Sequence, residues 1–151
     1  MELNSKSFSD EGNIPVRYTG FGEDVSPELN WEDVPEGTKS CAIIADDPDA
    51  PMGTWIHWVI YDIPASLNKL EENISREKVL SSGVKQGINS FGQIGYGGPY
   101  PPPGPAHRYV FTLYALDADL DLNTGLDKNA LMKSFDGHIL GETDLTGKFG
   151  R

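Results

Sequence analysis

The 151-residue sequence has little cysteine, little positive charge and no long apolar run. Its one cysteine, Cys41, excludes an intrachain disulfide and is typical of a reducing compartment, so we expect a cytoplasmic location. The longest apolar-rich run, 55–61, is far below the roughly 20 residues that span a bilayer. Residues 1–10 lack the apolar stretch of a signal peptide, so none is expected.

Basic residues are scarce: 12 lysines and arginines stand against 23 aspartates and glutamates, a net charge of −11. Residues 1–63 alone carry 13 acidic and 3 basic side chains. Duplex nucleic acids and anionic lipid surfaces are bound through clustered lysine and arginine. We therefore expect no nucleic-acid partner and no stable membrane insertion.

Motifs for covalent chemistry or for holding a cofactor are also missing. No GxSxG nucleophile elbow occurs, and Cys41 lies in an apolar run where a buried structural thiol is expected. The glycine-rich run 92–98 lacks the GK[ST] ending and the strand–loop–helix context of a phosphate-binding P-loop. The histidines and aspartates show no HxxxH or CxxC spacing that would support a metal. The sequence therefore predicts no metal, no cofactor and no enzymatic activity.

The residues that are present favour strands over helices. Runs rich in β-branched and aromatic residues predict three strands, and a fourth, weaker run predicts a closing strand: 40–46, 55–63, 108–116 and 143–149. Only two segments favour a helix: 66–72 and 127–137, the second with Asp127 as a cap and Gly137 as its end. This pattern indicates a mainly β fold, a sandwich or barrel, as a single domain over 1–151.

Glycine and proline concentrate in one segment, 87–105, where 6 glycines and 5 prolines occupy 11 of 19 positions. Such a composition excludes a helix or a central strand. Four apolar anchors lie within it: Phe91, Ile94, Tyr96 and Tyr100. We therefore predict an ordered, packed loop.

Each long predicted strand offers one titratable residue near an end: Asp47, His57 and His107. If these ends are adjacent, the three side chains converge on one pocket with Trp55 and Tyr109 as walls, together with the glycines at 97–98. Taken singly, each also fits a structural role, since a lone strand histidine is most often satisfied in the core and Asp-Pro favours a turn.

Strand alternation assigns the neighbours of these residues to faces. In the second strand, alternation predicts that His57 shares its face with Trp55, Val59 and Tyr61. In the third strand, His107 shares its face with Tyr109.

Four motifs follow one another along the chain: DPDAP at 47–51, GTWIHW at 53–58, GGP at 97–99 and HRYVF at 107–111. In this order they resemble the phosphatidylethanolamine-binding protein family, and more closely its prokaryotic Raf-kinase-inhibitor-like branch. Supporting segments lie at 26–31, 35–40 and 137–151.

The resemblance implies an antiparallel β-sandwich with a large central sheet, a smaller sheet and a few short helices. It also implies a small surface pocket for phosphate, phosphoryl headgroups or similar anions. Carried over by motif, the ligand-binding residues are Asp47, Trp55, His57, Gly98, Pro99, His107 and Tyr109.

The leading functional hypothesis is a non-catalytic binding module for a small anionic or phosphorylated ligand, able to regulate a kinase or protease. Binding is expected to strengthen between about pH 8 and 6 as histidine becomes protonated. One alternative is an inhibitor of a serine protease or kinase, acting through an exposed loop at 64–80 or 87–105. Another is an acid/base enzyme using His57 and Asp47. The resemblance to prokaryotic relatives also suggests a homodimer.

Overall fold

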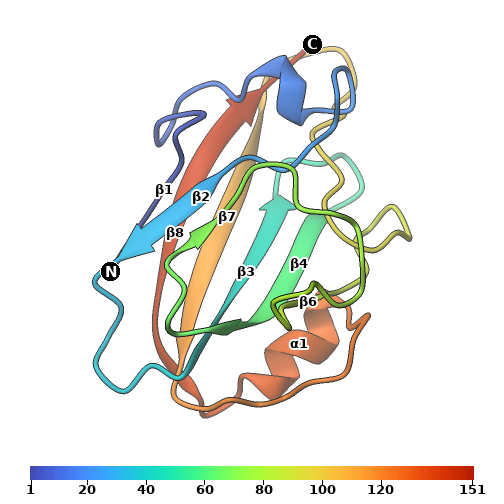
Figure 1. The fold of residues 1–151 in the computed structure, drawn as a ribbon. Coiled ribbons are helices and arrows are strands. Elements are labelled where there is room, and N and C mark those ends of the chain that lie inside the picture. Colours follow the sequence, from blue (N-terminus) through green and yellow to red (C-terminus); the bar gives the residue numbers. More distant parts are fainter.

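The three long apolar runs form the middle of a five-stranded antiparallel sheet in the computed structural model, which describes residues 1–151 (Figure 1). The strands of this large sheet, in spatial order, are β6 (Lys85–Gln86), β4 (Trp55–Pro64), β3 (Ser40–Asp47), β7 (His107–Leu116) and β8 (Ile139–Phe149). A second sheet contains β1 (Glu2–Asn4), β2 (Leu29–Glu32) and β5 (Lys69–Leu70). The predicted mainly β, two-sheet architecture is confirmed.

The predicted strands correspond closely to β3, β4 and β7, and the prediction that 108–116 lies inside the sheet is correct, because β7 runs between β3 and β8. The closing strand is longer than its sequence predicted. β8 begins at Ile139 and pairs with β7 along its whole length. Its exposed outer edge tolerates polar residues such as Glu142 and Asp144, which weaken the sequence pattern of a strand.

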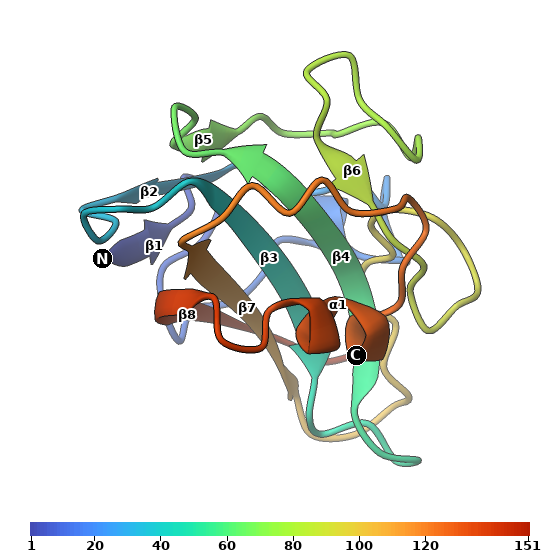
Figure 2. The ribbon, with the colours of Figure 1, turned by 90° about the horizontal axis from the view of Figure 1, so that it is seen from below.

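Strand β3 is apolar on both faces because both faces are covered. Its alternating residues Cys41, Ile43 and Ala45 join the core between the two sheets. The intervening residues Ala42 and Ile44 pack in a second core beneath helix α1 (Lys128–Ser134). Figure 2 shows α1 lying across the face of β3 and β4. The chain thus builds three layers around β3: small sheet, large sheet and helix.

One predicted helix forms and the other does not. At α1 the carboxylate of Asp127 accepts the amide of Ala130 at 2.8 Å, as an N-cap should. The helix expected at 66–72 was wrong, because this segment makes a turn and then strand β5, pairing with β2. So short a helix is marginal in water, whereas the open edge of β2 offers backbone partners. A single 3₁₀ turn, η1, spans Val16–Tyr18.

The Gly/Pro-rich segment 87–105 is buried at 95–99 and exposed at 91–93 and 102–105. Tyr96 is buried, stacks edge-on to Trp58 at 5.5 Å and donates its hydroxyl hydrogen to the Tyr18 carbonyl oxygen at 2.6 Å. Phe91 and Tyr100 remain about half exposed. The prediction of an ordered loop anchored by aromatic side chains is correct.

No helix of the structure is long and apolar enough to cross a bilayer.

Candidate functional site

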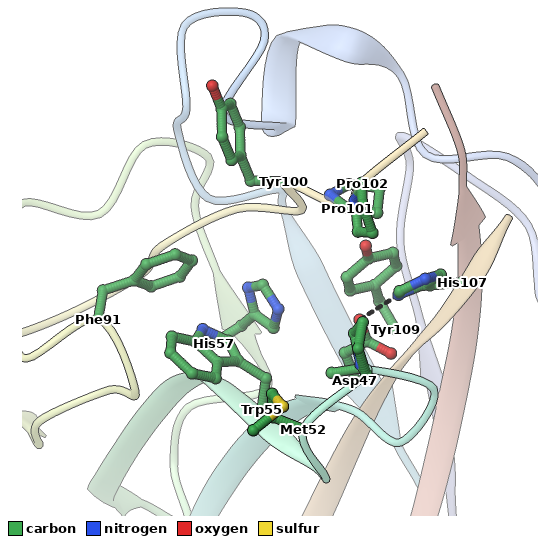
Figure 3. Close-up of a pocket in the computed structure, with 12 residues that line it drawn as sticks. Asp47, Met52, Trp55, His57, Phe91, Tyr100, Pro101, Pro102, His107 and Tyr109 are labelled. Carbon is green, nitrogen blue, oxygen red and sulfur yellow. Dashed lines mark hydrogen bonds and ion pairs between the residues drawn. The ribbon is translucent and has the colours of Figure 1, made fainter. Parts of the chain in front are cut away.

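A cavity of about 200 Å³ opens at one end of the large sheet. Antiparallel pairing brings the end of β3 beside the start of β4, where Asp47 pairs with Trp55. The same pairing places Asp46 opposite Val110 near the start of β7. The cavity is lined by residues of these strand ends and of two loops: Asp47, Ala50, Pro51, Met52, Trp55, His57, Phe91, Tyr100, Pro101, Pro102, His107 and Tyr109 (Figure 3). Five of the seven predicted site residues are among them.

A β-bulge directs His57 into this cavity. Between the pairs Asp46–Ile56 and Ala45–Trp58, strand β4 contains one more residue than β3, and that residue is His57. The bulge breaks the simple alternation of the strand. The predicted shared face of His57, Val59 and Tyr61 was therefore wrong, because Val59 and Tyr61 pack beneath α1.

His57 is buried and held in one orientation. Its Nδ1 lies 2.6 Å from the carbonyl oxygen of Gly97, and its ring packs edge-on against Tyr109 at 5.2 Å and Phe91 at 5.5 Å. A carbonyl oxygen can only accept, so Nδ1 carries the hydrogen and Nε2 is an acceptor in the neutral ring. Burial lowers the pKa of His57 below its ordinary value, although Gly97, Asp47 and Asp24 oppose this effect.

The second histidine is paired with the acidic residue of the site. Nδ1 of His107 lies 2.7 Å from Oδ2 of Asp47, and the other carboxylate oxygen of Asp47 accepts the Asp49 amide at 2.8 Å. Asp49 in turn binds the Arg108 guanidinium through both of its oxygens, at 3.0 and 2.8 Å. These contacts lower the pKa of Asp49 to about 2. The loop after β3 is thus held against the start of β7.

Tyr109 carries the one enclosed polar side-chain atom for which the chain provides no hydrogen-bond partner, its hydroxyl oxygen. Figure 3 shows this hydroxyl pointing toward Pro101 and Pro102. Burial, followed by the charge of Asp47, raises the pKa of Tyr109, so its hydroxyl stays protonated. An unpaired buried hydroxyl costs about 1–3 kcal/mol.

The other two predicted site residues, Gly98 and Pro99, do not line the cavity. The Gly98 amide donates to Oδ1 of Asp24 at 2.7 Å, and the Gly97 amide donates to the His57 carbonyl oxygen at 2.9 Å. Both amides are thus bonded within the chain, and the glycines at 97–98, which were predicted to help wall the pocket, do not line the cavity. Gly98 is required for another reason, because a Cβ there would lie 2.9 Å from the Cα of Thr19.

The apolar wall of the cavity was missed by the sequence reasoning. Phe91 packs edge-on to Trp55 at 5.4 Å, and Met52 at the tip of the loop after β3 is 95% exposed. Pro101 and Pro102 form the opposite side. The sequence contained a signal for this apolar wall, because exposed apolar residues in a turn and in a proline-rich loop often mark a binding site.

Neither a cluster of metal ligands nor the side chains most often used as nucleophiles are gathered at this site. No three His, Cys, Asp or Glu side chains converge anywhere in the structure as metal ligands would. No serine, threonine, cysteine or lysine lines the cavity. Cys41 is fully buried in the core, and burial raises the pKa of its thiol to about 11.

Comparisons with known proteins show which family the chain belongs to. The family model described as phosphatidylethanolamine-binding protein matches residues 4–150. The UPF0098 protein of Methanothermobacter thermautotrophicus is 49% identical over 151 residues, which cover 100% of this chain and 99% of its own. The UPF0098 protein YbhB of Escherichia coli is 37% identical, with 99% of each chain covered.

Two solved structures share the fold. A phosphatidylethanolamine-binding protein homologue, CT736 of Chlamydia trachomatis, superposes with a TM-score of 0.90 at 37% identity and covers 99% of this chain and 96% of its own. E. coli YbcL, described as a new member of the mammalian PEBP family, superposes with a TM-score of 0.91 at 29% identity, covering 99% and 98%. The chain belongs to the phosphatidylethanolamine-binding protein family.

Proposed function

We propose that this protein is a non-catalytic binding module whose cavity at the end of the large sheet takes a small phosphoryl group or a similar anion. Membership of the family supports a binding function in general. The observation that carries the finer proposal is the convergence of His57, His107 and Tyr109 on one cavity, each with a polar atom that the chain leaves unpaired.

The volume and the lining support a small ligand with an apolar part. Pockets for drug-sized molecules enclose about 300–1,000 Å³, and this cavity is smaller, at about 200 Å³. Its polar lining residues include Asp47, His57 and His107, while Met52 and Phe91 contribute apolar surface. A phosphoryl group therefore fits against the polar side chains, and any short substituent would contact the apolar ones.

The contacts within the site support binding over acid/base turnover. His57 is held by the Gly97 carbonyl and forms no hydrogen bond with Asp47, whose oxygens are occupied by His107 and the Asp49 amide. No serine, threonine, cysteine or lysine stands beside the His107–Asp47 pair to be activated by it. Inhibition of a protease or kinase, and a homodimeric state, stay predictions from the sequence.

Isothermal titration calorimetry with inorganic phosphate and phosphoethanolamine, from pH 8 to pH 6, tests the proposal. We expect affinity to rise as the pH falls and to drop at least about tenfold in His57→Ala, since a hydrogen bond to a charged group is worth about 1.5–3 kcal/mol. His138→Ala is the matched control, because this third histidine pairs with Asp117 at the surface and is not in the cavity. Binding that ignores both pH and His57→Ala would refute the site.

A further inference from the structure

We infer that the cavity selects oxyanions that bring their own acidic proton, namely hydrogen phosphate and phosphomonoesters, over sulfate and phosphodiesters. This inference rests on the proposed function and deepens it, because it names which anions the site accepts. It follows from which polar atoms in the cavity donate hydrogen bonds and which accept them.

The first step is the direction of His57. Its Nδ1 hydrogen is committed to the Gly97 carbonyl oxygen, so the neutral ring can only accept at Nε2. Nε2 of His57 has no partner within the chain. It is not fully enclosed, because the Tyr109 hydroxyl oxygen is the only enclosed polar side-chain atom without a partner. Nε2 is therefore reached from the cavity, and Figure 3 shows it turned toward Tyr109 and Asp47.

The second step is the charge around this ring. The acidic groups that act on His57 are Asp46 and Asp47 at the end of β3 and Asp24 in the loop before β2. On β7 it faces the titratable groups of Tyr109 and His107. No lysine or arginine lines the cavity.

An anion entering the cavity thus meets a carboxylate and an acceptor nitrogen before it meets a fixed positive charge. The His107 ring does not by itself offer the anion a donor hydrogen with a net positive charge. Its Nδ1 is directed at Asp47, so Nε2 donates only in the imidazolium form, whose charge the neighbouring carboxylate offsets. The Tyr109 hydroxyl donates, but reaching it requires displacement of Pro101 and Pro102.

The third step is what a ligand must supply. A ligand P–O–H can donate to Nε2 of His57 while its other oxygens accept hydrogens from the His107 imidazolium and, once Pro101 and Pro102 are displaced, from the Tyr109 hydroxyl. Sulfate has no proton at neutral pH, so one of its oxygens would face the lone pair of Nε2. Unmatched polar groups of this kind are a strong source of discrimination. We expect a preference of roughly 10- to 100-fold for the protonated oxyanion.

The same rule separates two sources of phosphoryl groups. A free phosphomonoester has a second pKa of about 6 and carries an acidic proton below that pH. A phosphodiester, as in an intact phospholipid headgroup, has no such proton. The structure therefore favours a soluble monoester, and its binding should weaken above about pH 6 as the ligand loses its proton.

Calorimetry at pH 6 with four probes tests the inference: inorganic phosphate, sulfate, phosphoethanolamine and glycerophosphoethanolamine. The last two share the ammonium group and differ as monoester and diester. We expect phosphate and phosphoethanolamine to bind at least about tenfold more tightly than sulfate and the diester, respectively. Equal affinity within either pair would overturn the inference and leave the proposed function standing. Binding of none of the four probes would overturn the proposed function itself.

A variant locates the discrimination at His57. In His57→Gln the side-chain amide can donate as well as accept, so the preference for phosphate over sulfate should collapse to within a few-fold. His138→Gln should keep the wild-type ratio, because His138 lies outside the cavity. An unchanged ratio of phosphate to sulfate affinity in folded His57→Gln would show that His57 does not select ligands that carry a proton.

Discussion

The two ends of strand β4 hold polar clusters of opposite character. At the far end, Nζ of Lys85 can donate three hydrogen bonds, and three acceptors stand around it: Asp62 and Asp121, both at 2.9 Å, and the Leu122 carbonyl oxygen at 2.6 Å. At the cavity end, Nε2 of His57 and the Tyr109 hydroxyl have no partner in the chain.

This difference separates a structural cluster from a binding site. In a saturated cluster, hydrogen bonds within the folded chain offset the free energy of removing the polar groups from water, so the cluster stabilises the fold. In an unsaturated cluster, this desolvation free energy is offset only when a ligand binds. Mutations at the two ends should therefore change different quantities: stability at Lys85, and ligand affinity at the cavity.

The largest effect on stability is expected at the saturated end. Lys85→Met removes the cation beside the largely buried Asp62 carboxylate, so the free energy of unfolding should fall by about 1–3 kcal/mol. Chemical denaturation measures this change, and phosphate affinity should stay at the wild-type value. Lys78→Met is the control, because Lys78 is exposed and forms no ion pair, and it should lie within about 0.5 kcal/mol of wild type.

A smaller effect of opposite sign is expected at Tyr109. Tyr109→Phe removes an enclosed hydroxyl that has no partner, so the free energy of unfolding should stay unchanged or rise by up to about 1 kcal/mol. Phosphate affinity should fall. The control is Tyr96→Phe, which loses a hydrogen bond to the Tyr18 carbonyl and should destabilise the protein by about 1 kcal/mol. Equal losses of stability in both variants would contradict the expected difference between the unpaired hydroxyl of Tyr109 and the hydrogen-bonded hydroxyl of Tyr96.

The smallest effect is a slope of stability against pH. The folded pKa of His57 lies below its unfolded value near 6.5, so the unfolded chain binds the proton more readily. Stability should therefore fall as the pH drops through about 6.5, and His57→Gln should flatten the curve between pH 8 and 5. Asp49, with a pKa of about 2, contributes stability above about pH 4 and loses it only below that value.

A control addresses that slope directly. Gln93→Ala, which changes an exposed and uncharged side chain, should retain the wild-type dependence between pH 8 and 5. A wild-type curve without any fall below pH 6.5 would show that burial does not hold His57 neutral.

The sequence predicted the strands well where both faces are buried. The runs at β3, β4 and β7 are continuous and apolar, because the small sheet covers one face and α1 the other. It predicted the helix at α1 from its cap. It missed strand β5, where pairing with β2 outweighs local preference, and it underestimated β8, whose polar edge faces solvent.

The candidate site was predicted in part. Asp47, Trp55, His57, His107 and Tyr109 do converge, as strand ends that are neighbours in an antiparallel sheet must. Gly98 and Pro99 do not line the cavity. A motif shows that a glycine is needed, but not whether its amide serves a ligand or, as here, the carboxylate of Asp24.

The sequence by itself determined the shortage of positive charge, the β-rich composition and the family, because these depend only on which residues are present and in what order. The tertiary structure decided the direction of each hydrogen bond in the cavity. The bulge at His57 and the Gly97 carbonyl orient one ring, and Asp47 orients the other. These partners lie 40 and 60 positions apart in the chain, so only folding brings them within hydrogen-bonding distance.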